Sequence, residues 1–211
     1  MNEQTLKTII FFSVIVILIS SIVVIYSSCK RQDYFTPVEA VKTLTDGNKT
    51  FQKGDHNLYQ NVKPKVAVLC CSEHYIPAEI LFNLNKGEVV MVQELGQVPY
   101  LNSMASLEYA VGQLGVNSLI VLGHSNCQAV KMAMDAPPHG SPFLDFICKT
   151  ISDNFKVEDV LDDAIKKNAQ STLHKIIQSS DIINNAINAN KLSVMWGVYD
   201  EKSGKVDLKQ T

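Results

Sequence analysis

The sequence carries little net charge and has no cysteine pattern typical of a disulfide scaffold. Its 211 residues have a formal net charge of -2, which gives no reason to expect nucleic acid as a partner. The five cysteines are an odd number, and no paired spacing among them indicates a disulfide framework. Internal repeats and low-complexity tracts are also missing, and nothing indicates a nucleotide or sugar site. With 46% apolar residues, the chain has material for one domain of ordinary size plus an extension.

The extension is an uncharged apolar stretch near the start of the chain. Residues 8–29 include no charged side chain, and a helix of this length spans roughly 30 Å of hydrocarbon at about 1.5 Å per residue. One interpretation is an uncleaved membrane anchor. The other is a secretory signal processed near Ser27 and Ser28, with Cys29 as the modified residue of a bacterial lipoprotein. We favour the anchor, and we assign residues 1–31 to an N-terminal membrane anchor or signal segment.

The charges that flank this stretch do not determine its orientation in a membrane. Lys7 stands on one side, and Lys30 and Arg31 stand on the other. We expect a membrane-associated protein on the bacterial periplasmic or extracytoplasmic side, with the cytoplasmic face as the alternative.

Two short apolar runs, residues 66–69 and 119–122, are each followed by residues that can bind a soft metal. Both are rich in branched side chains, as buried parallel strands are. Cys71 follows the first run, and His124 and Cys127 follow the second. Such strands end at one edge of an open α/β sheet, where ligands bind, so we expect the three side chains to meet there. Two thiolates and an imidazole suit zinc and leave a fourth position open; alternatively, the cysteines simply pack as small hydrophobic residues.

The rest of the chain alternates helical and strand patterns. Thr36, Pro37 and Glu39 form a helix start with a capping box. Further helices are predicted over residues 78–84, 106–115, 143–152, 157–179 and 182–189, with Asp181 as a cap, and further strands over 88–92, 192–198 and 205–208. The pattern predicts an α/β fold with a mainly parallel β-sheet flanked by helices, preceded by one N-terminal hydrophobic helix.

Several motifs resemble those of the β-class carbonic anhydrases. They are residues 71–79 (CSEHYIPAE), 86–88 (KGE), 106–111 (SLEYAV), 114–116 (LGV), 123–127 (GHSNC) and 196–200 (WGVYD). In that family, Cys-x-Asp-x-Arg followed by His-x-x-Cys supplies three zinc ligands and a catalytic Asp–Arg pair. The resemblance implies that Cys71, His124 and Cys127 bind Zn²⁺, and that residues 32–211 form a β-carbonic anhydrase-like zinc domain.

The sequence departs from the family at the catalytic pair. Glu73 stands at the Asp position and Tyr75 at the Arg position. The resemblance implies a zinc lyase that hydrates carbon dioxide reversibly to bicarbonate by a zinc-bound hydroxide, with Glu73 and Tyr75 as catalytic residues and an activity that these substitutions could reduce. In the alternative, Glu73 closes the site as a fourth ligand. The protein would then be a non-catalytic zinc-binding scaffold or binding module.

Other polar residues near these motifs receive simpler interpretations. Gln93 replaces an Arg that supports the site in the family, and Gln128 replaces a common Gly beside the metal pocket. Cys70 precedes a ligand, but alternation along a strand points it to the opposite face. His74 and His139 are expected to be solvated surface histidines.

The resemblance also implies the partners of the chain. The small-molecule substrate is carbon dioxide or bicarbonate. Members of the family dimerise through the sheet edge and the N-terminal helix, so we expect a homodimer or a higher even oligomer.

Overall fold

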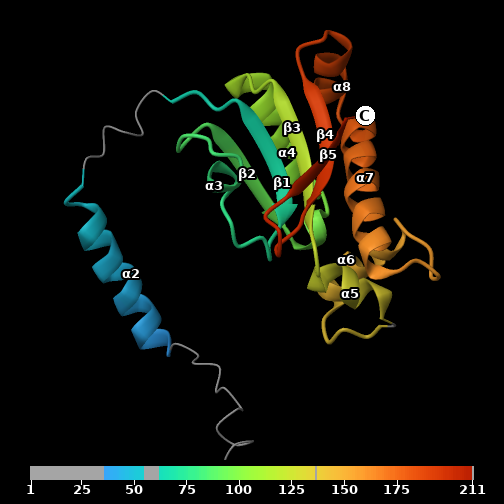
Figure 1. Cartoon of the computed structure of the whole chain (residues 1–211), viewed down its shortest axis with the longest axis horizontal. Helices are drawn as coiled ribbons and strands as arrows, with labels where there is room; N and C mark the ends of the chain where they lie inside the picture. The colour runs from blue at the N-terminus through green and yellow to red at the C-terminus, as the bar shows by residue number, and fades with distance from the viewer. Residues whose placement is uncertain (1–35, 55–61, 136, 211) are drawn as a thin grey trace, which may run out of the picture. The chain divides into compact units, whose positions relative to one another are not determined.

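The structure, a computed structural model, describes residues 36–54, 62–135 and 137–210 (Figure 1). The predicted N-terminal hydrophobic helix and the predicted domain boundary after residue 31 lie outside these residues. In the part of the chain that is described, no helix is both long enough and apolar enough to cross a membrane. The anchor and the localisation inferred from it therefore stay predictions.

The chain divides into two compact units, Met1–His56 and Asn57–Thr211. The described helix of the first unit is α2 (Pro37–Phe51), which begins as predicted. The Glu39 N–H donates to the Thr36 hydroxyl, and the Thr36 N–H donates to the Glu39 carboxylate at 2.8 Å, so the capping box is confirmed. The helix leaves Val38 and Leu44 largely exposed.

The second unit is built around one five-stranded sheet with the order β2-β1-β3-β4-β5. The strands are β1 (Val66–Cys71), β2 (Val89–Glu94), β3 (Ser118–His124), β4 (Ser193–Tyr199) and β5 (Val206–Gln210). The first four are mutually parallel, and β5 runs antiparallel to β4. The predicted α/β class with a mainly parallel sheet is confirmed, and every predicted strand is present with bounds shifted by a few residues.

The predicted helices of this unit are present with shifted ends, and one helix, α5, was not predicted. They are α3 (Ala78–Leu81), α4 (Leu101–Tyr109), α5 (Gln128–Met134), α6 (Pro142–Ser152), α7 (Leu161–Ser179) and α8 (Asp181–Asn188). The prediction that α4 begins at Ser106 was wrong, because the Tyr100 N–H donates to the Ser103 hydroxyl and caps an earlier first turn. The cap of α8 is Ser180 rather than Asp181, since the Ser180 hydroxyl accepts from the Ile183 N–H.

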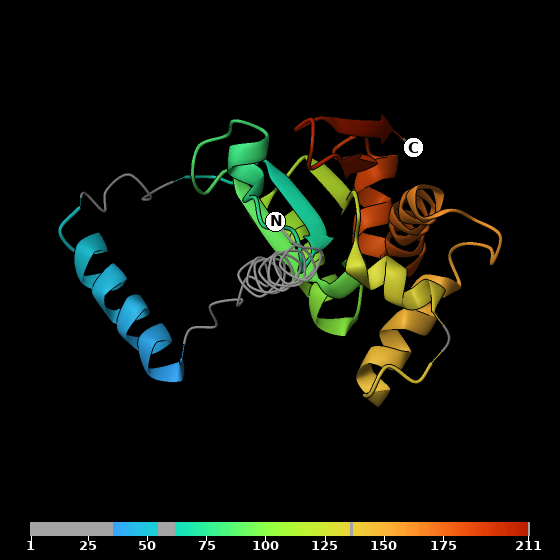
Figure 2. The same ribbon diagram turned by 60° about the horizontal axis from the view of Figure 1, so that its bottom comes forward.

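Helices cover both faces of the sheet, and a further layer lies beyond one end of it. Helices α4, α7 and α8 contribute to the apolar cluster on one face, where Leu173 and Ile176 are fully buried, each worth about 1.5–3 kcal/mol. Helix α3 contributes to the cluster on the opposite face. Figures 1 and 2 show α5 and α6 together past the ends of the parallel strands. The cluster formed there includes Cys71 and Cys127. Cys70 belongs to the opposite-face cluster, which confirms the predicted alternation.

Candidate metal centre

Four side chains with metal-binding atoms meet at the carboxyl ends of β1 and β3. They are Cys71, Glu73, His124 and Cys127, whose nearest ligand atoms all lie within 4.8 Å of one another. The structure thus brings together the three metal ligands expected from the sequence, and it adds Glu73 to them. Tyr75, the other expected catalytic residue, is 83% exposed and is not part of this buried group.

Strand register explains why residues so far apart in sequence meet. Strands β1 and β3 are parallel neighbours with Cys70 opposite Leu122, so they end side by side. The chain then turns sharply after His124: the Ser125 N–H donates to the Tyr199 carbonyl at 2.8 Å, and Asn126 adopts φ 61°. This turn brings Cys127 back over the end of β1.

The two sulfur atoms are hydrogen-bonded to each other and are not joined by a disulfide. The Cys71 and Cys127 sulfurs are 3.9 Å apart, and both cysteines are free. The hydrogen bond from Cys127, against the effect of burial, lowers the pKa of Cys71 to about 4. The same hydrogen bond and burial raise the pKa of Cys127. A backbone donor also stabilises the Cys71 thiolate, since the Gly96 N–H points at its sulfur with N···S 3.2 Å.

The surroundings of His124 leave one ring nitrogen free to bind a cation. Its Nδ1 lies 3.0 Å from the Ser125 carbonyl oxygen, which can only accept, so Nδ1 carries the proton. Its Nε2 is buried without a hydrogen-bond partner among the described residues. Burial lowers the pKa of His124, but the Cys71 thiolate and the nearby Glu73 and Glu201 carboxylates raise it overall. A position that favours a proton on Nε2 also favours a metal ion there.

Glu73 lies beside the imidazole and is held by the main chain. Its Oε2 accepts a hydrogen bond of 2.8 Å from the Gln128 N–H and lies 3.6 Å from His124 Nε2. The Gln128 side chain itself is exposed, so its backbone rather than its side chain supports the carboxylate. Gln93 donates to the His74 carbonyl at 3.4 Å, next to Glu73 in sequence. These backbone contacts limit where the carboxylate can point.

Sequence reasoning missed Glu201 and misjudged His74. Glu201 Oε1 lies 3.5 Å from His124 Nδ1, so a carboxylate faces the ring nitrogen that does not face the sulfurs. Carboxylates often take this position beside a metal-binding histidine. The available signal was its position just after β4, at the same edge of the sheet as the ligands. His74 is 6% exposed rather than solvated, because its ring packs edge-on against Tyr199 with centroids 5.5 Å apart. Burial and the positive charge of His124 lower its pKa.

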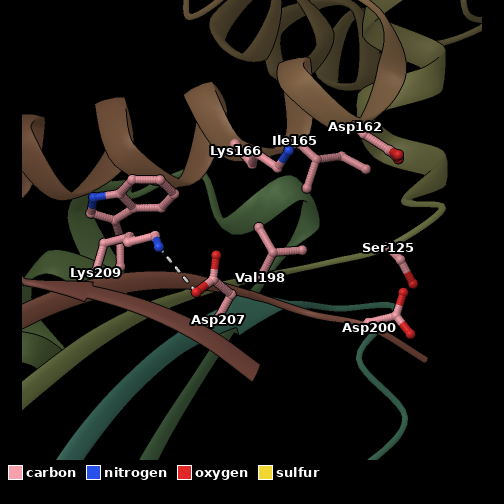
Figure 3. Close-up of a pocket in the computed structure, with 9 residues that line it drawn as sticks. Ser125, Asp162, Ile165, Lys166, Val198, Asp200, Asp207 and Lys209 are labelled. Atoms are coloured by element: carbon pink, nitrogen blue, oxygen red, sulfur yellow. Dashed lines mark ion pairs between the residues drawn. The ribbon is translucent and has the colours of Figure 1, made fainter. Parts of the chain in front are cut away.

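A separate cavity lies on the face of the sheet that α7 covers (Figure 3). It has a volume of about 230 Å³ and lies between α7 and the strands β4 and β5. Lys209 and Asp207 pair across its floor at 3.1 Å, and Ile165 and Val198 form apolar parts of its wall. None of the four ligand-type side chains lines it, so this cavity is not the metal centre.

Zinc fits the donor set that the chain provides. It binds thiolate sulfur and imidazole nitrogen, often with a carboxylate or an exchangeable water in the last position. The buried Nε2 of His124 has no other partner among the described residues, and the Cys71 thiolate has a negative charge to balance. Cys71, His124 and Cys127 would hold the ion, with Glu73 within reach.

The Gly96 turn beside the sulfurs gives a stability prediction. Gly96 has φ +62°, and a Cβ at this position would lie 2.3 Å from Ile151 Cδ1. Gly115 has φ +73° with nothing within 4 Å of such a Cβ. Both alanine variants acquire left-handed strain of about 1–2 kcal/mol, but only Gly96→Ala adds a clash in a buried cluster. We expect Gly96→Ala to lose about 1–3 kcal/mol more than Gly115→Ala in urea unfolding followed by Trp196 fluorescence. Equal losses would show that Ile151 can move aside freely.

Comparisons with known proteins agree with this geometry. The carbonic anhydrase family profile matches residues 66–206. The carbonic anhydrase of Mycolicibacterium smegmatis is 28% identical over 192 residues, covering 82% of this chain and 93% of that protein. The solved Coccomyxa β-carbonic anhydrase in complex with acetazolamide shares the fold, with TM-score 0.66 at 21% identity over 85% of this chain and 89% of that one. For a tetrameric β-carbonic anhydrase of Sordaria macrospora, the TM-score is 0.65 at 20% identity, and the match covers 82% of this chain and 95% of that one. The chain belongs to the β-class carbonic anhydrase family.

Proposed function

We propose that the protein hydrates carbon dioxide reversibly to bicarbonate, with Zn²⁺ held by Cys71, His124 and Cys127. The observation that carries the proposal is the meeting of two sulfurs, an unpartnered imidazole nitrogen and a carboxylate within 4.8 Å. Family membership supports carbon dioxide hydration in general terms. When bound, zinc acts as a Lewis acid that lowers the pKa of a coordinated water and so supplies a nucleophile near neutral pH.

The residues of the chain would position the reaction around the ion. The Ser125 carbonyl and the Glu201 carboxylate keep the proton of His124 on Nδ1, which leaves the Nε2 lone pair for the metal. Glu73 already accepts from the Gln128 N–H, and its remaining lone pairs can accept a hydrogen bond from the attacking water. That hydrogen bond would orient the water toward the carbon atom of the substrate. Glu73 would thus take the role of the Asp in the usual pair of the family.

A second candidate function follows from the same carboxylate. Glu73 Oε2 lies only 3.6 Å from His124 Nε2, and its ligand atom belongs to the four-atom group. As a fourth ligand it would close the site and leave a non-catalytic zinc-binding scaffold. Two thiolates and one carboxylate around Zn²⁺ would also carry a net negative charge, which disfavours ionisation of any water.

The two candidates differ in a direct measurement on the purified protein. Both require about one zinc ion per chain. The enzyme requires that carbon dioxide hydration, followed by stopped flow with a pH indicator, rises above the rate of the chelator-treated protein. A zinc-loaded chain with no activity above that background would support the scaffold, and a chain without stoichiometric zinc would contradict both candidates.

We also propose assembly into a homodimer or a higher even oligomer. The solved Sordaria macrospora enzymes are described as tetrameric. In this chain, α2 exposes Val38 and Leu44, and β2 is an edge strand that pairs only with β1 within the described residues. Light scattering coupled to size exclusion tests the proposal, and a monomer at working concentrations would overturn it.

A further inference from the structure

A chain of two side-chain amides, the half-buried Asn154 and the fully buried Asn168, leads from Lys175 on α7 to Gly96, the residue whose N–H contacts the Cys71 sulfur. Lys175 Nζ donates to Asn154 Oδ1 at 2.7 Å, and Asn154 Nδ2 donates to Asn168 Oδ1 at 2.7 Å. Asn168 Nδ2 then donates to the Gly96 carbonyl at 2.9 Å. Gly96 is the residue whose N–H points at the Cys71 sulfur.

The direction of this amide chain is determined by its two ends. The Lys175 ammonium can only donate, so the Asn154 amide must present its oxygen to it. The Gly96 carbonyl can only accept, so the Asn168 amide must present its nitrogen to it. Both amides therefore have one orientation consistent with every bond, and neither can flip without losing hydrogen bonds at both sides.

Gly96 needs such support because its own conformation is soft. A glycine at φ +62° lacks the side chain that would restrict its backbone, and the clash described above forbids a larger residue. Asn168 is fully buried, so its hydrogen bond to the Gly96 carbonyl forms where water does not compete. The carbonyl and the N–H of Gly96 belong to neighbouring peptide planes that meet at its Cα, so holding the carbonyl limits the rotation of Gly96 and with it the directions that its N–H can take.

We propose that Asn168, oriented through Asn154 by Lys175, is a positioning residue that holds the Gly96 N–H on the Cys71 sulfur and thereby strengthens metal binding. The inference rests on the proposed metal site and concerns how tightly that site binds. The N–H···S bond stabilises the anionic form of the sulfur, which is the form that coordinates metal ions, and it keeps the sulfur aimed at the common centre.

The experiment compares zinc affinity, by competition with a chromophoric chelator, in variants along α7. Asn168→Leu is expected to bind zinc about 10- to 100-fold more weakly, the range typical of outer-shell changes. Thr172→Val is the matched control: Thr172 is equally buried on the same helix, and its hydroxyl has no hydrogen-bond partner among the described residues. Its zinc affinity should equal that of the unmodified protein.

A second pair of variants keeps the test decisive if Asn168→Leu fails to fold. Lys175 is only partly buried, so Lys175→Met should fold. It should also bind zinc more weakly than the unmodified protein, but by a smaller factor than Asn168→Leu. Lys175→Arg retains a side-chain end that can only donate, so its zinc affinity should match that of the unmodified protein. In the Co²⁺-loaded protein, the sulfur-to-cobalt absorption band should shift in energy with Asn168→Leu and Lys175→Met, but not with Thr172→Val.

The outcomes separate the inference from the proposed function. If the unmodified protein binds no zinc, the metal site itself fails and the inference falls with it. If the unmodified protein binds zinc but the Asn168 and Lys175 variants stay within about twofold of Thr172→Val, with no band shift, the amide chain is only structural. Weaker binding with a shifted band, restored by Lys175→Arg, supports the positioning role.

Discussion

Cys127→Ser is expected to abolish stoichiometric zinc binding and, with it, carbon dioxide hydration. The serine hydroxyl is a hard, weakly acidic donor, whereas zinc in this set depends on soft thiolate ligands. The loss of affinity should exceed the roughly 100-fold upper range of outer-shell changes, because a direct ligand is removed. Chelator competition measures the affinity, and stopped-flow hydration measures the activity.

The fold should survive this substitution. A serine at position 127 is almost isosteric and can still donate a hydrogen bond to the Cys71 sulfur, 3.9 Å from the present Cys127 sulfur. Cys148→Ser is the matched control, since Cys148 is buried in the same apolar cluster but lies outside the ligand group. The zinc content and the carbon dioxide hydration rate of Cys148→Ser should be unchanged. Retained zinc in Cys127→Ser, or equal losses in both variants, would contradict the assignment of Cys127 as a ligand.

The sequence predicts the sheet and the meeting of the ligand residues because these depend on strong local signals. Buried parallel strands are short, continuous apolar runs, and their carboxyl ends meet at one edge whatever their order. The ends of helices are less predictable, since they depend on single hydrogen bonds. Ser103 sets the start of α4, and Ser180 caps α8. Each follows a residue whose side chain could make the same kind of hydrogen bond, so the sequence alone does not show which of the two starts the helix.

The supporting groups of the centre could not be read from the sequence for a different reason. Asn168 lies on α7 and Glu201 after β4, and both reach the site only through the tertiary fold. Their residue types are common on surfaces, so no local pattern marks Asn168, and for Glu201 the available signal is its position just after β4. His74 is similar: only the packing of Tyr199 over its ring makes it buried. A role that depends on one contact between distant segments leaves little signal in the sequence of either segment.

Glu73→Gln separates the catalytic role of this carboxylate from the ligand role. Glutamine keeps the size of the side chain and can still accept from the Gln128 N–H, which is 2.8 Å from the present carboxylate. It loses the negative charge that would orient and accept a proton from the attacking water. If Glu73 is catalytic, kcat should fall by about 100-fold or more while zinc affinity stays the same, because all three zinc ligands (Cys71, His124 and Cys127) are untouched.

Glu79→Gln is the control for the loss of one carboxylate charge outside the ligand group. Glu79 is a half-buried carboxylate at the start of α3, outside the ligand group. Its substitution should change neither kcat nor zinc affinity. If Glu73 is instead a fourth ligand, Glu73→Gln should weaken zinc binding and leave hydration no slower. X-ray absorption at the zinc edge then completes the comparison. Replacement of a fixed carboxylate oxygen by an exchangeable one in the variant would reject the catalytic assignment, because a carboxylate that is bound to the metal cannot also orient the water.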